Sequence, residues 1–229
     1  MIAAVVIDIE GTVSPTRAVR GDLYDYTRQR LPRWLVENRG DAAASVIAQT
    51  RELAGRPDAE VADVGEILCG WLDSDLKAEP LKTAQGLICG QGFRDGDLHG
   101  EFFTDAAPAL RAWRAAGVGL YVYSSGSVRN QQDWFAHARG GELASLIDGW
   151  FDLSTAGDKR ETSSYVRIAD SIGLPPNKIL FLSDHPDELD SAANAEFLVV
   201  GVTRPGEPNS PRPPHRWVTS LADVDARRL

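Results

Sequence analysis

The stretch I-A-A-V-V-I-D-I-E-G-T, residues 2–12, decides the fold of this 229-residue chain. Residues 2–7 form a short apolar run rich in β-branched side chains, which is typical of a strand buried on both faces of a parallel sheet. Two acids, Asp8 and Glu10, follow the run directly, and Gly11 and Thr12 form a turn. The segment therefore predicts a central strand that ends in carboxylates.

Three further apolar runs resemble the first and alternate with helical patterns. Strands that alternate with helices favour a doubly wound, parallel α/β sheet. The predicted strands cover residues 118–123, 178–182 and 197–202, and the predicted helices cover residues 106–116, 128–137, 162–172 and 187–195.

The long segment between the first and second predicted strands has a different pattern, with four helical stretches and no convincing strand. We therefore expect a helical cap, residues 16–100, inserted into a core formed by residues 1–15 and 101–229. A later stretch, residues 204–214, contains five prolines and predicts a loop or an extended arm. The helical stretches of the cap are expected at residues 22–37, 41–53, 60–77 and 81–93.

Charge and composition exclude several classes of protein. The chain has 24 Lys and Arg against 33 Asp and Glu, a net charge of −9, which argues against nucleic acid or an anionic membrane as a partner. The two cysteines, Cys69 and Cys89, fit buried thiols in a reducing cytoplasm rather than a disulfide or zinc site. No leader sequence or membrane span is recognisable, so a cytoplasmic protein is expected, with a monomer as the working expectation.

Chemically active side chains follow three of the predicted strands. Asp8 and Glu10 follow the first, Ser124 and Ser125 the second, and Ser183 and Asp184 the third. The carboxyl ends of parallel strands meet at one edge of a sheet, where α/β proteins bind their ligands. Lys159, which precedes a predicted helix, completes the set.

These residues suit phosphoryl transfer to an aspartate. Asp8 would attack phosphorus in line and form an aspartyl phosphate that water then hydrolyses. Facing carboxylates repel a phosphate dianion, so a cation is needed, and oxygen ligands favour Mg²⁺. Asp8 and Asp184 are the expected carboxylate ligands, and Glu10 contributes through its backbone carbonyl or its side chain. The Glu10 carboxyl group could also protonate the leaving oxygen and activate water.

Read together, these segments resemble the four motifs of the haloacid dehalogenase superfamily. Glu at the second acidic position and several core segments also resemble the enolase-phosphatases of methionine salvage. The superfamily motifs are Asp8-x-Glu10-Gly-Thr, Ser124 or Ser125, Lys159 and Ser183-Asp184-x-x-x-Glu188. The core segments are Glu101-Phe-Phe, Pro108-Ala-Leu-Arg-Ala-Trp113, Tyr121-Val-Tyr-Ser-Ser-Gly-Ser127 and Ile168-Ala-Asp-Ser-Ile-Gly173.

The resemblance implies a magnesium-dependent phosphatase that enolises and dephosphorylates a phosphorylated small molecule, the 2,3-diketo-5-methylthiopentyl-1-phosphate of that family. By the same resemblance, Asp8 and Glu10 would be catalytic, and Asp8, Glu10 and Asp184 would hold Mg²⁺. Ser124, Ser125 and Lys159 would bind the substrate phosphate, and Glu188 would lie just behind the metal ligands.

One alternative remains open, and two others are disfavoured by the sequence. A divergent phosphatase for another small sugar-type phosphate is suggested by Val13 and Cys89, where the family has Thr and an aromatic residue. A dehalogenase on the same fold is disfavoured, because its chemistry needs neither Mg²⁺ nor an acid at position 10. A signalling receiver with a phosphorylatable aspartate is also disfavoured, because receivers have about 120 residues in a single domain and lack a large helical cap after the first strand.

Overall fold

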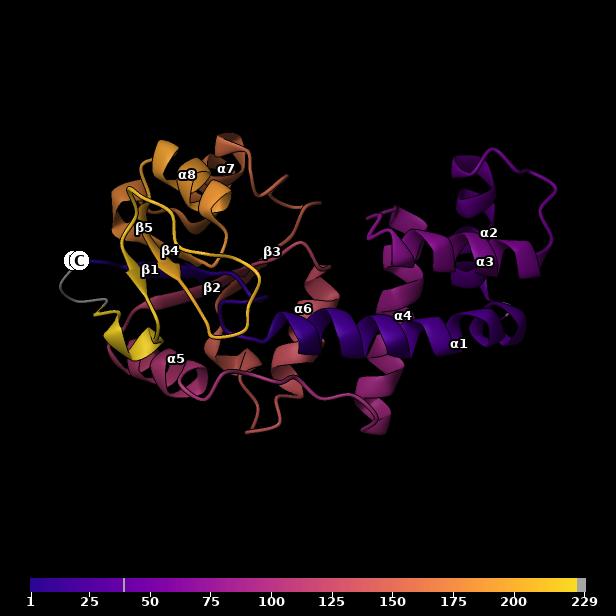
Figure 1. Ribbon diagram of the computed structural model, residues 1–229, viewed down its shortest axis with the longest axis horizontal. Helices are drawn as coiled ribbons and strands as arrows, with labels where there is room; N and C mark the ends of the chain where they lie inside the picture. Colours follow the sequence, from indigo (N-terminus) through magenta and orange to yellow (C-terminus); the bar gives the residue numbers. More distant parts are fainter. Residues whose placement is uncertain (39, 226–229) are drawn as a thin grey trace. The chain divides into compact units, whose positions relative to one another are not determined.

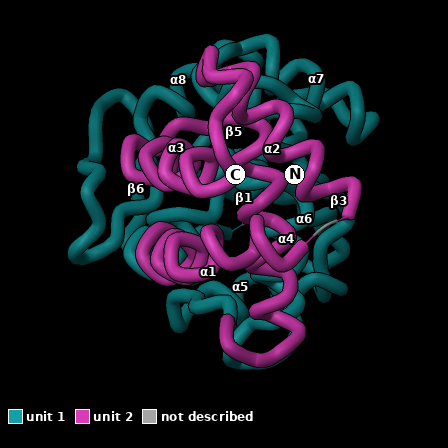
Figure 2. The backbone as a smooth tube through the Cα atoms, turned by 90° about the vertical axis from the view of Figure 1, so that its right-hand side faces the viewer, with its two compact units in different colours: residues 1–19, 99–229 teal, residues 20–98 magenta. Residues whose placement is uncertain are grey.

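The structure, a computed structural model, describes residues 1–38 and 40–225. The chain divides into two compact units (Figure 2). Met1–Val19 and His99–Leu229 form the first, here the core unit, and Arg20–Leu98 forms the second, here the helical unit. The chain therefore leaves the core unit after its first strand and returns to it before the second.

A six-stranded sheet organises the core unit, with the strand order β3-β2-β1-β4-β5-β6 and every pairing parallel. This arrangement confirms the predicted doubly wound α/β sheet with a helical segment inserted after the first strand. The strands are β1 (Ala4–Ile7), β2 (Gly119–Tyr123), β3 (Gly149–Phe151), β4 (Ile179–Ser183), β5 (Leu198–Val202) and β6 (Trp217–Val218).

Helices cover both faces of the sheet: α7 and α8 lie on one side of it and α5 and α6 on the other (Figure 1). Two covered faces explain why all four β1 residues are buried and why the run lacks polar side chains. The helices of the core unit are α5 (Ala106–Ala115), α6 (Val128–Ala136), α7 (Thr162–Ile172) and α8 (Pro186–Asn194), with short 3₁₀ turns at Ala144–Leu146, Pro176–Lys178 and Leu221–Asp223.

Alternation along β1 divides its side chains between the two faces, because successive residues of a strand point to opposite sides. Ala4 and Val6 belong to one buried apolar cluster with Tyr165 and Ile168 of α7 and Leu189 of α8. Packing on this face fixes α7 and α8, and with them the loops that precede both helices. Those loops contain Lys159 and Asp184.

The helical unit has its own apolar core, which includes Leu31, Leu68 and Ile88. Four α-helices supply it, after a turn of π-helix at Arg17–Asp22. Two predicted stretches change their bounds by more than one residue: the one expected at 60–77 covers residues 61–73, and the one expected at 81–93 extends in both directions. The helices are α1 (Leu23–Glu37), α2 (Asp41–Leu53), α3 (Val61–Asp73) and α4 (Glu79–Asp95).

Two strands were not expected from the sequence, β3 and β6. They have three and two residues and lie at the two edges of the sheet. Runs this short carry no readable alternation, so only their pairing with β2 and β5 reveals them. Within the described residues, no helix is long and apolar enough to cross a bilayer.

Gly201 of β5 lets the chain that follows the arm pack closely on the sheet. A Cβ at this position would lie 2.3 Å from the Trp217 indole. We expect Gly201→Ala to lower the free energy of unfolding by about 1–3 kcal/mol, the usual cost of overpacking. Urea unfolding measures the change, with Gly140→Ala as the control because no atom lies within 4 Å of its Cβ position. Equal unfolding midpoints for the two variants would contradict the expectation.

Candidate active site

Asp8 lies where the sheet changes its winding direction. β1 leads on to its neighbour β2, whereas β4, its neighbour on the other side, leads on to β5. The connections therefore leave the carboxyl ends of β1 and β4 in opposite directions. Such a switch point forms a crevice in open α/β sheets. The backbone N–H of Asp8 donates to the Leu182 carbonyl at 2.9 Å, which continues the pairing of β1 with β4. Asp184 follows two residues later on the β4 side.

Both carboxylate oxygens of Asp8 have partners in a buried environment. The side chain of Asp8 is only 6% exposed. The Lys159 ammonium is 2.5 Å from Oδ1, and the Thr12 hydroxyl donates to Oδ2 at 3.0 Å. Thr12 reaches Oδ2 because the chain turns sharply after β1: the N–H groups of Val13 and Ser14 both donate to the Ile9 carbonyl. Asp8 is therefore held in one orientation.

Lys159 joins Asp8 to a second carboxylate. Its ammonium lies 2.7 Å from Glu188 and 5.6 Å from the centre of the Tyr123 ring. The Tyr165 hydroxyl donates to the Lys159 carbonyl at 2.7 Å and fixes the backbone just before α7. Burial alone would lower the pKa of Lys159, but the charges of Asp8 and Glu188 outweigh it and raise that pKa. Lys159 is therefore a firmly charged cation inside the site.

Asp184 approaches the turn after β1 so closely that only glycine fits at position 11. Gly11 has φ +69°, and a Cβ there would lie 2.2 Å from Asp184 Oδ2. The Asp184 N–H donates to the Thr12 hydroxyl at 2.9 Å, and the Asn209 amide donates to Asp184 Oδ2 at 2.8 Å. Thr12 thus connects Asp8 and Asp184 through one hydroxyl group.

The site has too little positive charge for its acids. Burial, and then the charge of Asp8, raise the pKa of Asp184 to about 7. Burial also raises the pKa of Glu188 to about 7, with the Lys159 ammonium opposing the shift and the Asp8 charge adding to it. Among the described residues, the ion pairs of Asp8, Asp184 and Glu188 involve only the Lys159 ammonium, so the three carboxylates carry two negative charges in excess when all are ionised. This imbalance fits a divalent cation.

A Mg²⁺ ion at this edge of the sheet would need ligands besides side chains. Among residues 1–38 and 40–225, no three Asp, Glu, His or Cys side chains converge closely enough to hold a metal by themselves. Asp8 and Asp184 would therefore be complemented by backbone carbonyl oxygens and water, which Mg²⁺ accepts readily. Glu10 stays a predicted ligand, through its backbone carbonyl or its side chain. Glu10 is half-buried, and its backbone forms a bridge with Ser14.

Ser124 and Ser125 lie at the end of β2, the strand beside β1. Ser124 is buried, its N–H donates to the Phe151 carbonyl at 3.2 Å, and its hydroxyl accepts from the Gly126 N–H at 3.4 Å. Ser125 is half-buried in the same turn. The turn therefore presents serine hydroxyls and backbone N–H groups at the edge of the sheet that carries Asp8.

Sequence reasoning missed four residues that organise this edge: Thr12, Asp152, Asn209 and Arg204. Asp152 follows the unpredicted β3, and it accepts from the Val128 N–H at 3.0 Å and so fixes the start of α6. In the sequence, Thr12 indicates only a turn, although its position beside the two acids is a usable signal. The sequence offered no signal for Asn209 or Arg204, because their partners lie 25 and 192 residues away.

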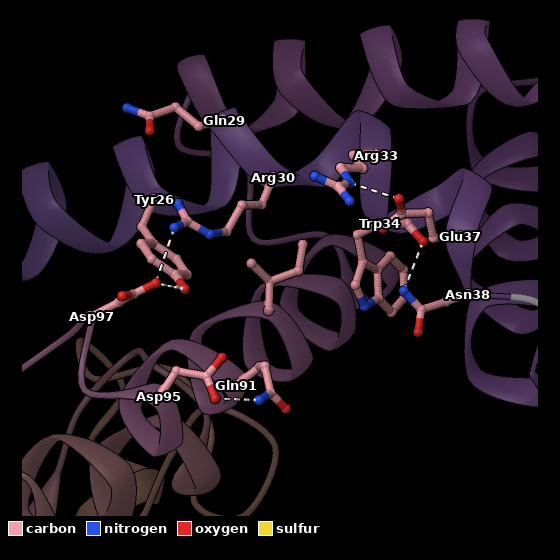
Figure 3. Close-up of a pocket in the computed structure, with 11 residues that line it drawn as sticks. Tyr26, Gln29, Arg30, Arg33, Trp34, Glu37, Asn38, Gln91, Asp95 and Asp97 are labelled. Atoms are coloured by element: carbon pink, nitrogen blue, oxygen red, sulfur yellow. Dashed lines mark hydrogen bonds and ion pairs between the residues drawn. The ribbon is translucent and has the colours of Figure 1, made fainter.

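The helical unit contains a separate cavity of about 470 Å³ between α1 and α4 (Figure 3). Its charged side chains pair with one another: Arg30 with Asp97 at 3.1 Å, and Arg33 with Glu37 at 2.6 Å. None of the residues that follow the strand ends lines this cavity. Its size alone does not make it the reactive site, so the candidate site is the cluster around Asp8.

Comparisons with known proteins agree on one family. Residues 2–196 match the model of the haloacid dehalogenase-like hydrolases. The chain is 65% identical to an enolase-phosphatase E1 of Nocardia farcinica, covering all of this chain and 98% of that one. It is 51% identical to an enolase-phosphatase E1 of Streptomyces avermitilis, over 90% of this chain and 87% of the other.

Solved structures give the same picture of the fold. The UTR4 protein of Saccharomyces cerevisiae matches with a TM-score of 0.83 and 28% identity, over 98% of this chain and 100% of that one. CbbY of Rhodobacter sphaeroides, solved in complex with phosphate, matches with a TM-score of 0.64 and 16% identity, over 97% and 96% of the two chains. The second likeness concerns the fold alone.

Proposed function

The chain belongs to the haloacid dehalogenase-like hydrolases and, among them, to the enolase-phosphatases, and on that basis we propose that it is a Mg²⁺-dependent phosphatase with Asp8 as its nucleophile. The observation that carries this proposal is the buried cluster of Asp8, Lys159 and Glu188 beside Asp184. A nucleophilic carboxylate needs a fixed orientation and nearby positive charge before a phosphate dianion can approach. Thr12 and Lys159 supply these two conditions.

The reaction would proceed in two steps. An oxygen of Asp8 attacks phosphorus, the P–O bond to the substrate breaks, and the departing oxygen takes a proton from Glu10. Water then attacks the aspartyl phosphate, Glu10 takes its proton, and inorganic phosphate leaves with Asp8 restored. Lys159 balances charge on the phosphoryl oxygens throughout, and the hydroxyls of Ser124 and Ser125 donate to them. Mg²⁺ held by Asp8, Asp184 and the Glu10 carbonyl would neutralise charge on the transferred group.

For the substrate, we propose 2,3-diketo-5-methylthiopentyl-1-phosphate, in keeping with the methionine-salvage enolase-phosphatases. Glu at position 10 supports this choice, because its carboxylate reaches one methylene further than an aspartate would. It could then remove a proton from the carbon beside the phosphoester as well as serve the ester oxygen. A divergent phosphatase for another small sugar-type phosphate is the second candidate, favoured by Val13 and by Cys89, which is buried in the helical unit.

The helical unit, Arg20–Leu98, is proposed to act as the cap that selects the substrate. We also propose a cytoplasmic location, because Cys69 and Cys89 are not joined in a disulfide, as expected for a reducing compartment. The proposed partner is a phosphorylated small molecule.

Phosphate release from a panel of phosphorylated metabolites tests the proposed function. With Mg²⁺ we expect the diketo phosphate to be the best substrate, with enol absorbance appearing alongside free phosphate, and we expect EDTA to abolish both signals. Equal activity in EDTA and Mg²⁺ would refute the metal requirement. Faster turnover of a simple sugar phosphate, with no enol signal from the diketo compound, would favour the divergent phosphatase.

Glu10→Gln should lower kcat by roughly 10²–10⁴, the usual contribution of a positioned acid–base group. Mg²⁺ affinity should stay near the wild-type value if the ligand is the backbone carbonyl, because the substitution leaves the carbonyl in place. Steady-state kinetics and calorimetric Mg²⁺ titration separate the two properties. Loss of Mg²⁺ binding in this variant would instead assign the side chain as a ligand.

A further inference from the structure

Asn209 contacts a carboxylate of the proposed metal site from a distant part of the chain. Its amide donates to Asp184 Oδ2 at 2.8 Å, and Asp184 lies 25 residues earlier, at the end of β4. A carboxylate group without fixed partners can rotate about the bond to its side chain. A hydrogen bond to one of its two oxygens restricts this rotation. The other oxygen, Oδ1, is then turned in a defined direction.

Asn209 belongs to the proline-rich arm, residues 204–214, and the arm is anchored before this residue. Arg204 is 7% exposed and donates twice to the Thr12 carbonyl, at 3.1 and 2.9 Å. Its third nitrogen donates to Asp105 at 2.8 Å. Glu207 accepts from the Thr16 N–H at 3.2 Å. The first half of the arm is therefore fastened to the turn that contains Thr12.

The arm is anchored again after Asn209, on the helix that starts beside Asp184. Arg212 pairs with Asp187 at 2.8 Å and also with Asp190, both on α8. The His215 ring nitrogen lies 2.6 Å from Asp190. Because the segments on both sides of Asn209 are fixed, its amide is already held at Asp184. Binding of a metal ion would therefore cost little conformational entropy in the arm.

We propose that the arm is a positioning element and that Asn209 is its functional residue, orienting the Asp184 carboxylate for the divalent cation. The inference rests on the proposed function, since it concerns the metal site of that reaction. Arg204 acts on the same site from the other side, because Thr12, whose carbonyl it holds, donates to Asp8 and accepts from the Asp184 N–H. Residues that orient metal ligands typically change metal affinity or activity by about 10–100-fold when removed.

Calorimetric titration of the intact protein with Mg²⁺ alone tests the proposal. Asn209→Ala should raise the Kd for Mg²⁺ by about 10–100-fold, and Asn209→Ser should do the same because its hydroxyl is too short to replace the amide. Ser210→Ala is the matched control, since Ser210 is the next residue of the arm and is exposed. At saturating Mg²⁺ the kcat of Asn209→Ala should return to within a few-fold of the wild-type value, with an unchanged circular dichroism spectrum.

Two results would overturn the proposal. One is a Kd in both Asn209 variants equal to that of the wild type. The other is an equal loss of Mg²⁺ affinity in Ser210→Ala, which would assign the effect to a loosened arm rather than to the Asn209 amide. A wild-type protein that binds no Mg²⁺ would refute the proposed function together with this inference, whereas binding that is insensitive to Asn209 would refute the inference alone.

Discussion

Asp8→Asn is expected to lower the rate of phosphate release by about 10⁴–10⁶-fold, because losing the nucleophile disables every later step. The asparagine side chain keeps the shape of the carboxylate but lacks its negative charge and its nucleophilic oxygen. Lys159 still has Glu188 as an ion partner at 2.7 Å, so the variant should fold normally. Removing one acid from a cluster with excess negative charge should leave the free energy of unfolding unchanged or slightly higher.

Single-turnover assays with Mg²⁺ and urea unfolding measure the two effects of this substitution. Asp170→Asn is the matched control, since it makes the same chemical change on an exposed position of α7. The control should retain full activity. Residual turnover of Asp8→Asn within tenfold of the wild type would show that another group attacks phosphorus.

Lys159→Ala is expected to lower both activity and stability, in contrast to Asp8→Asn. Loss of one preorganised charged donor typically reduces kcat by about 10²–10³, and KM should rise because the ammonium also attracts the bound phosphate. Asp8 and Glu188 would then be buried without their cation. Removing one partner of a buried ion pair typically costs about 3–5 kcal/mol of unfolding free energy.

Kinetics and urea unfolding again measure the outcome, and Lys159→Gln, which keeps most of the side-chain volume, separates lost charge from lost packing. Lys178→Ala is the control, because Lys178 is exposed before β4. Wild-type kinetics in Lys159→Ala at low salt would make Lys159 a structural residue. Unaltered stability would show that the two carboxylates become protonated at little cost.

Much of the fold was readable from the sequence because its signals are local. The run that ends at Ile7 had to be a buried strand, and the periodicity of residues 162–172 matches the bounds of α7 without change. Glycine also predicted a helix end: Gly173 ends α7 in the left-handed conformation. Such signals depend on neighbours a few residues apart, so they survive without knowledge of the tertiary structure.

The composition of the candidate site was also readable in part. The order of parallel strands brings their carboxyl ends to one edge, so acids after the first and third predicted strands were expected to lie close together. The structure places Asp8 and Asp184 on either side of the Thr12 hydroxyl. Their roles as nucleophile and metal ligand stay predictions, which the substitutions and titrations above address.

Only the tertiary structure decided how these acids are held and charged. The edge strands β3 and β6 exist through pairing and not through a pattern of their own. Arg204 meets the Thr12 carbonyl across 192 residues, and Asn209 meets Asp184 across 25. The raised pKa of Asp184 likewise depends on burial and on the distance to Asp8.

The sequence by itself determined which local segments become strands and helices and which reactive groups end them, because hydrophobic periodicity acts over a few residues. Contacts between distant segments, and the electrostatics that follow from them, depend on the tertiary fold, because residues far apart in the sequence meet only in the folded chain.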